Sequence, residues 1–174
     1  MRSVNLFLSL IILSILTISC GDDNETTGLI GEWQATSFEA TAITEIDFFG
    51  ISSTTTSNLQ GENINYSIEF KETTYNTQGS YTITGTSNQD GYMVELEDQE
   101  YNNVSSDGDY TSSESTIIIY DVLFQFDEDP VIPAGENEMQ YVIDGDNLTI
   151  TDEVIQNEAG TKITVNTKST WTRK

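Results

Sequence analysis

Apolar and polar residues alternate along most of the chain beyond Leu29. In segment 63–71 the polar residues are interleaved with Ile64, Tyr66, Ile68 and Phe70. A period of two places the apolar side chains on one face of a β-strand and the polar ones on the other. The same alternation recurs at 80–84, 92–97, 139–143, 148–150 and 163–171. Because no long amphipathic helix is visible, the pattern predicts an all-β domain.

Several segments depart from this alternation. Asp144-Gly145 lies between two alternating runs and predicts a tight hairpin turn. Segment 115–126 is apolar on both faces, which predicts a strand that is covered on both sides or whose outer face meets a partner. Segment 54–57 is polar on both faces, which is compatible with a strand edge or a loop. Segment 127–135 holds both prolines and predicts a long connecting loop.

The first residues form a continuous apolar stretch. Arg2 precedes the run Leu6–Ile18, which only Ser and Thr interrupt. This run is shorter than the ~20 residues that a membrane-spanning helix needs. It matches the apolar core of a secretory signal peptide, which has ~7–15 residues after a positive start. We therefore expect residues 1–19 to be a signal peptide that is removed during export.

The chain's one cysteine comes directly after this stretch. Ser19-Cys20-Gly21 resembles the lipobox of bacterial lipoproteins, in which the cysteine is acylated and becomes the new N-terminus, although Thr17 replaces the usual aliphatic residue. The alternative is an ordinary secretory signal followed by a chance cysteine. Two or three acyl chains on Cys20 would give lasting membrane attachment. Residues 20–28 then form an acidic, flexible tether.

The start of that tether carries a second resemblance. Asp22 and Asp23 are similar to the acidic export signal of Bacteroidota lipoproteins, which directs them to the cell surface. The resemblance implies an outer membrane lipoprotein of the cell envelope, on the cell surface or on the periplasmic face. An acidic tether that is merely solvated is the alternative.

The charge balance excludes several functions. The chain has 29 Asp and Glu, 6 Lys and Arg, no His, and a formal net charge of −23. Such a surface repels phosphate backbones, so no nucleic-acid partner is expected. Without His there is no His-based triad and no His-ligated zinc, and a single Cys cannot form an internal disulfide. Removal of residues 1–19 would take away one base and no acid, so the mature charge would be 5 − 29 = −24.

Both ends of the β domain carry a tryptophan motif. The domain opens with Gly31-Glu32-Trp33 and closes with Trp171-Thr172-Arg173. With the hairpin at 141–150, these motifs resemble the lipocalin-like lipoproteins of Bacteroidota over residues 29–174. The resemblance implies an antiparallel up-and-down β-barrel of about eight to ten strands. It also implies that Arg173 packs across the Trp33 ring at one barrel end, with Gly31 beside them, in a cation–π contact worth ~0.5–2 kcal/mol.

A small barrel either fills its interior with side chains or leaves room for one small ligand. We expect a small apolar or amphipathic ligand, or alternatively a packed core, at the inward-facing candidates, namely Tyr66, Ile68, Phe70, Tyr81, Tyr92, Phe124, Phe126 and Tyr141. The alternative function is a non-enzymatic module that docks an envelope protein or a glycan through its loops and the apolar strand at 115–126.

Acidic residues are the remaining candidates for chemistry. Paired carboxylates can hydrolyse glycosides, but no pair lies in an apolar context, so no enzyme is expected. Three clusters place oxygen atoms at short spacing, as calcium prefers: 107–109, 127–129 and 144–147. None has the twelve-residue EF-hand pattern, and we predict no dedicated metal site and no cofactor. The chain is expected to be a monomer.

Overall fold

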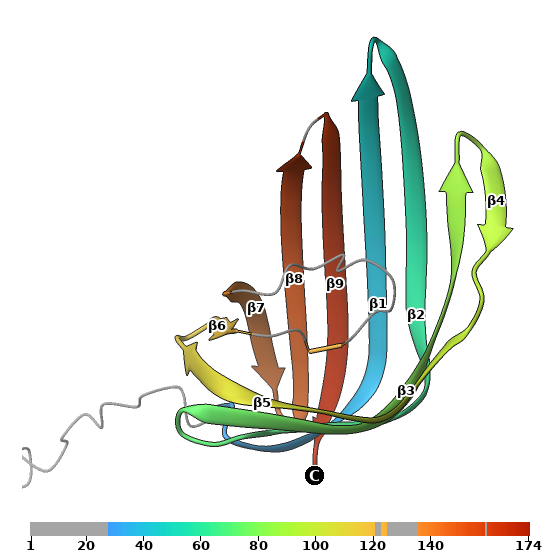
Figure 1. Cartoon of the computed structure of the whole chain (residues 1–174). Coiled ribbons are helices and arrows are strands. Elements are labelled where there is room, and N and C mark those ends of the chain that lie inside the picture. Colours follow the sequence, from blue (N-terminus) through green and yellow to red (C-terminus); the bar gives the residue numbers. More distant parts are fainter. Residues whose placement is uncertain (1–27, 121–122, 125–135, 159) are drawn as a thin grey trace, which may run out of the picture.

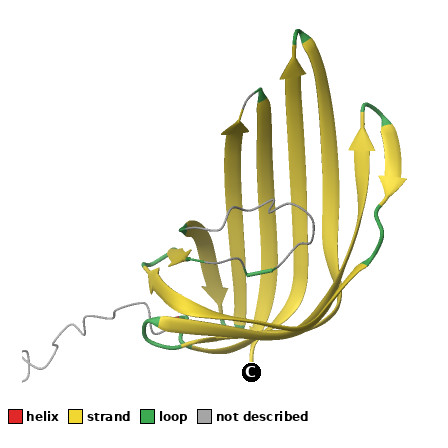
Figure 2. Ribbon diagram, viewed as in Figure 1, coloured by secondary structure: helices red, strands yellow, loops and turns green. Residues whose placement is uncertain are grey.

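The computed structural model describes residues 28–120, 123–124, 136–158 and 160–174. The predicted signal peptide, nearly all of the tether, and the loop predicted at 127–135 lie outside these residues. The described residues contain no α-helix (Figure 2). The nine strands are β1 Gly31–Phe48, β2 Ile51–Phe70, β3 Thr74–Gln89, β4 Tyr92–Glu95, β5 Gln99–Ser112, β6 Thr116–Ile119, β7 Asn137–Asp144, β8 Asn147–Glu158 and β9 Thr161–Arg173. The predicted all-β class is confirmed.

The strands pair antiparallel and close into a ring. Their order in the sheet is β2-β1-β9-β8-β7-β6-β5-β3-β4, and an additional pairing joins β2 to β3. Apart from the β4 excursion, strands that follow one another in the chain are neighbours in the sheet. The pairing of β1 with β9 brings the first and last strands together. Eight strands therefore form the ring, and β4 lies outside it, paired with β3.

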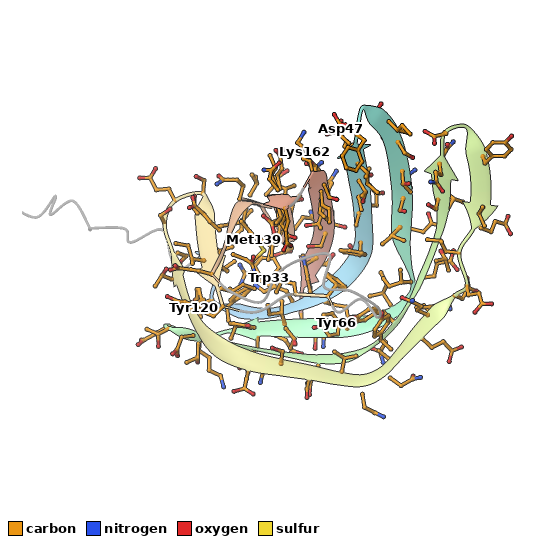
Figure 3. The ribbon with its side chains drawn as sticks, turned by 45° about the horizontal axis from the view of Figure 1, so that its top comes forward. Trp33, Asp47, Tyr66, Tyr120, Met139 and Lys162 are labelled. Carbon is orange, nitrogen blue, oxygen red and sulfur yellow. The ribbon has the colours of Figure 1, made fainter. Side chains whose placement is uncertain are left out.

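The strands differ in length, which divides the sheet into two parts (Figure 1). The ring is complete only where all eight strands are paired. It ends at the level of Thr151, because β7 pairs with β8 no further than that residue. Beyond that level β8, β9, β1, β2, β3 and β4 continue as an open, curved sheet, which we call the wall. Figure 3 shows Asp47 and Lys162 at the far end of the wall from Trp33 and Tyr66. The wall leaves two strand edges, β4 and the upper part of β8, without a paired neighbour among the described residues.

The hydrophobic core lies inside the ring. Trp33, Trp171, Tyr66 and Phe70 are its largest fully buried side chains. On each strand these core positions alternate with outward-facing polar ones, as the period of two predicts. Segment 63–71 is confirmed as the lower part of β2, where Tyr66, Ile68 and Phe70 are at most 1% exposed.

Irregular backbone bends the sheet where the wall joins the ring. The register shifts between Glu62 and Asn65 on β2 and between Gly79 and Tyr81 on β3. Gly79 has φ +140°, and a Cβ there would lie 2.0 Å from the carbonyl oxygen of Asn65. Only glycine fits this close approach of two backbones. Figure 1 shows β3 and β5 crossing the base of the molecule before β3 rises into the wall.

Two sequence predictions are settled by the pairing of the strands. The predicted hairpin is confirmed, and its two turn residues are Gly145, with φ +58°, and Asp146, since Asp144 pairs with Asn147. Segment 54–57 is neither an edge nor a loop. It lies in β2 and pairs with β1 on one side and β3 on the other. Both of its faces are polar because this part of β2 lies in the open wall, outside the ring that encloses the hydrophobic core.

The prediction of one long apolar strand at 115–126 is wrong. Strand β6 covers only Thr116–Ile119, and Ile117 and Ile119 face the core. The chain then leaves the sheet and buries Leu123 and Phe124, which are 7% and 4% exposed. The segment is apolar in every register because it enters the core twice, first as a strand and then as part of a connection.

Candidate functional site

The interior of the ring, where the sequence predicted either a ligand or a packed core, is occupied by aromatic rings. Phe124 lies at its centre, with ring centroids 4.3 Å from Phe38, 5.2 Å from Tyr66, 5.3 Å from Tyr81 and 5.7 Å from Trp171. Tilted and edge-on contacts at these distances are typical of a packed aromatic core. The structure thus brings Tyr66, Tyr81 and Phe124 together, but against one another rather than around a space.

The other predicted ligand residues lie apart from this cluster. Phe70 packs edge-on against Tyr110 at 5.1 Å, and Ile68 is fully buried. Tyr141 donates its hydroxyl to the carbonyl oxygen of Ser113 at 2.7 Å. Tyr92 is 80% exposed, which corrects its expected inward burial. Phe126 lies outside the described residues.

The buried tyrosine hydroxyls hold turns and connections in place. Tyr66 donates to the carbonyl oxygen of Leu123 at 2.8 Å, which fixes the connection that carries Phe124. Tyr110 donates to the carbonyl oxygen of Lys71 in the β2–β3 turn. Burial, followed by the nearby Tyr141, raises the pKa of Tyr110, so it remains protonated and can donate. These contacts are structural, and the hydroxyls of Tyr66 and Tyr110 are both used within the fold.

One end of the ring carries the contact expected from the tryptophan motifs. The guanidinium carbon of Arg173 lies 4.1 Å from the centroid of the Trp33 ring. Arg173 also donates to the carbonyl oxygens of Ile30, at 3.0 Å, and of Gly28. A Cβ at Gly31 would lie 2.9 Å from Nη1 of Arg173, so glycine leaves room for the guanidinium. These contacts tie the entry to β1 to the end of β9.

Large exposed apolar side chains lie on the wall at the β1–β2 turn and on β4, and others, such as Tyr120 and Val142, lie elsewhere on the described surface. In the β1–β2 turn Phe49 is 92% exposed, and Ile51 next to it is 76% exposed. On β4 the exposed fractions of Tyr92, Met93 and Val94 are 80%, 70% and 60%. We call these five residues the apolar rim. Large exposed apolar groups concentrated at one end of a fold mark interaction sites.

The β1–β2 turn is unusual in its chemistry. Phe49 and Gly50 both have positive φ, 52° and 78°. Two-residue hairpin turns with this backbone favour Asn-Gly, because a large side chain is strained at the first position. A phenylalanine here is costly for folding and is almost fully exposed. This turn was not predicted, and Gly50 after Phe49 was the one local signal for it in the sequence.

The concave face of the wall carries small and polar side chains on β1 and β2 and apolar side chains on β8 and β9. Continuing the core-facing positions upward, β1 presents Ala42 and Thr44, and β2 presents Ser57 and Thr55. In the row of Ala42 the neighbouring positions are Val165 on β9 and Val154 on β8. One step closer to the ring, β8 carries Asp152, whose pKa is raised by burial and lowered to a smaller extent by the backbone of Glu153. Among the described residues no three acidic, His or Cys side chains come together to hold a metal ion, including those near 107–109 and 144–147.

A second surface feature lies on the outer face of the ring. Gln34, Ser67, Gln78 and Ser105 form a row across β1, β2, β3 and β5, according to the register of the pairs. They line a groove of about 530 Å³ that contains neither an aromatic ring nor an acid. Gln34 donates to the carbonyl oxygen of Tyr66 within the sheet at 2.8 Å. The groove offers hydrogen bonds without a stacking platform.

No protein-family model, no curated protein and no solved structure matches this chain. In the part of the chain that the structure describes, no helix is long and apolar enough to cross a membrane. Three features of the chain therefore bear on its function: the aromatic interior of the ring, the contact of Arg173 with Trp33 at one end of the ring, and the apolar rim.

Proposed function

We propose that this protein is a lipid-anchored lipoprotein of the cell envelope, attached to the outer membrane through Cys20, with a lipocalin-like barrel that acts as a docking module. The apolar run that ends at Cys20 supports export and acylation. The ring of eight antiparallel strands, with Arg173 over Trp33, supports the lipocalin-like barrel. In this proposal the protein is a non-enzymatic monomer that binds a protein partner.

The observation that carries the docking function is the contrast between the interior and the rim. A site for a small molecule typically encloses ~300–1,000 Å³ lined by apolar side chains. Here the aromatic candidates for such a lining contact one another, as the 5.2 Å between Tyr66 and Phe124 illustrates. The apolar rim, in contrast, leaves Phe49 92% exposed. Docking therefore has more structural support than transport of an apolar ligand in the ring.

The position of Gly28 agrees with a rim that faces outward. Gly28, the last residue of the predicted tether, accepts a hydrogen bond from Arg173 at one end of the ring. Strand β1 starts there and runs for 18 residues to the turn that carries Phe49. Gly28 and the turn that carries Phe49 therefore lie at opposite ends of β1, as Figure 1 shows for the start and the end of that strand. An upright domain would present the rim away from the anchoring membrane.

Replacing Cys20 by alanine is expected to release the protein from the membrane, since no acyl chain can then be attached and one chain alone is already a marginal anchor. Cell fractionation with an alkaline wash and immunoblotting measures the distribution. The matched control is the Asp22→Asn, Asp23→Asn double variant, which should stay in the membrane fraction. Retention of the Cys20→Ala protein in washed membranes would contradict the anchor.

Replacing Phe49 by asparagine is expected to weaken docking without loss of stability, because Asn-Gly suits the turn better than Phe-Gly. Aromatic anchors of interfaces are typically worth ~2 kcal/mol or more, which is roughly a thirtyfold loss in affinity. Chemical cross-linking on intact cells, read as adducts of defined mass, measures the effect. Val142→Asn is the control, since Val142 is 65% exposed on β7, away from the rim. Equal adduct yields for both variants would contradict docking at the rim.

A further inference from the structure

Strand β4 presents a free edge of backbone hydrogen-bonding groups. It pairs with β3 on one side and has no paired neighbour on the other among the described residues. Beyond its end, the N–H of Leu96 donates to the carbonyl oxygen of Gly85 at 2.9 Å. In an antiparallel ladder alternate residues direct both backbone groups to the same neighbour. Val94 therefore faces β3, and the N–H and C=O of Met93 and Glu95 point to the open edge.

The side chains of β4 make this edge apolar on both faces. Val94 pairs with Ser87 and lies on the concave side, whereas Met93 lies on the opposite side. Natural proteins usually protect an exposed edge with charged side chains, proline, a covering segment or a very short strand, and of these β4 has only its length of four residues and one charge. Within β4 the one charged residue is Glu95, and its four residues are all exposed. Such an edge is suited to accept another strand.

The charge around β4 restricts what that strand can be. Asp90 precedes β4, and Glu97 and Asp98 follow it, all of them exposed. The sequence contains no Lys or Arg between Lys71 and Lys162. A second copy of the chain, also at −23, would bring the same acids to the edge and be repelled. A segment flanked by basic residues would be attracted instead.

We propose that the free edge of β4 binds an extended segment of a partner protein by strand addition, and that this segment has alternating apolar residues flanked by lysine or arginine. The backbone groups of Met93 and Glu95 supply the hydrogen bonds, and the apolar side chains of β4 supply cross-strand contacts. The surrounding acids select the basic flanks. This inference rests on the proposed docking function and assigns it a site and a chemical class of partner.

The edge is tested with a peptide probe of defined chemistry. The probe is a synthetic peptide with an alternating valine and threonine core between two pairs of lysines, and its binding is measured by fluorescence anisotropy at physiological ionic strength. Met93→Pro removes the edge N–H but no hydrogen bond to β3. Met93→Thr keeps the edge N–H and is the matched control. We expect Met93→Pro to bind about tenfold more weakly than Met93→Thr.

Two further measurements separate strand addition from general charge attraction. In the wild-type protein, the amide hydrogens of Met93 and Glu95 should exchange more slowly when the peptide is bound, and a peptide with glutamate flanks should produce no such protection. Equal binding of the peptide by the Met93→Pro and Met93→Thr variants, or no protection at Met93, would overturn the inference. A dimer of the wild-type protein that Met93→Pro dissociates would overturn the choice of partner.

The outcome in cells distinguishes this inference from the docking proposal. If Phe49→Asn abolishes the cross-linked adducts and Met93→Pro leaves them unchanged, docking at the rim is supported and strand addition at β4 is refuted. Loss of the adducts in both variants, with Met93→Thr unaffected, supports both. Adducts that persist in all three variants refute the docking proposal itself.

Discussion

Replacing Gly79 by alanine is expected to lower the free energy of unfolding by roughly 4 kcal/mol, combining ~1–3 kcal/mol of backbone strain with ~1–3 kcal/mol of overpacking. Gly79 has φ +140°, a conformation that side chains rarely allow. The added Cβ would lie 2.0 Å from the carbonyl oxygen of Asn65 and 2.7 Å from Cα of Tyr66. Both contacts involve backbone, so relief requires β2 and β3 to move apart.

A second glycine separates the two contributions. Gly91, in the β3–β4 turn, has φ +95° but no atom within 4 Å of an added Cβ. Gly91→Ala should therefore cost only the strain of about 1–2 kcal/mol. Urea unfolding followed by tryptophan fluorescence measures both variants. Similar losses for the two would mean that the close approach at Asn65 does not determine how the wall joins the ring.

Local alternation and turn chemistry account for most of what was predicted correctly. The run from Ile64 to Phe70 alternates because one face of β2 lines the core. The hairpin at 144–147 forms because glycine suits the first position of its two-residue turn and alternating runs flank it. The contact of Arg173 with Trp33 was inferred from a resemblance rather than from spacing, since these residues are 140 positions apart in sequence. Such long-range proximity cannot be read from a local pattern.

The failures have a common physical origin. In segment 115–126, an apolar run indicates burial but does not say whether the chain is still in the sheet. Strand β6 can continue only as far as β7 pairs with it, and that pairing ends where Ile119 meets Asn137. Phe124 therefore lies in the connection and not in a strand. Segment 54–57 is a paired strand whose concave side is open, and neither face then needs apolar residues. Local composition cannot distinguish that situation from a loop.

The candidate site was harder to predict than the fold. Tyr66, Tyr81 and Phe124 were correctly expected to face inward, but periodicity cannot distinguish a packed interior from a lined cavity. Only the contacts among their rings decide between the two. The apolar rim was missed for two reasons: Phe49 carries no periodic signal, and the alternation at 92–97 predicted a half-buried strand, whereas Tyr92 and Val94 are exposed. Their meaning emerges from exposure, which is a property of the folded chain.

Replacing Phe124 by alanine is expected to cost ~3–5 kcal/mol, the usual range for removing a buried aromatic ring. Phe124 is 4% exposed, and its ring contacts Phe38, Tyr66 and Trp171 from a connection rather than a strand. The sheet cannot collapse into the vacated space without breaking the ring of strands. Urea unfolding measures the loss, and Phe124→Leu, which retains most of the volume, is the control and should cost less.

The same variant tests whether the interior is a core or a carrier site. An apolar cavity of sufficient size stays dry and takes up small apolar molecules such as benzene. Benzene should therefore raise the melting temperature of Phe124→Ala and leave that of the wild-type protein unchanged. A wild-type protein that benzene stabilises equally, or a Phe124→Ala variant that loses less than ~1 kcal/mol, would indicate space around this ring and would favour the carrier function. An effect confined to the variant means that Phe124 fills the ring, which leaves the rim as the surface available for recognition.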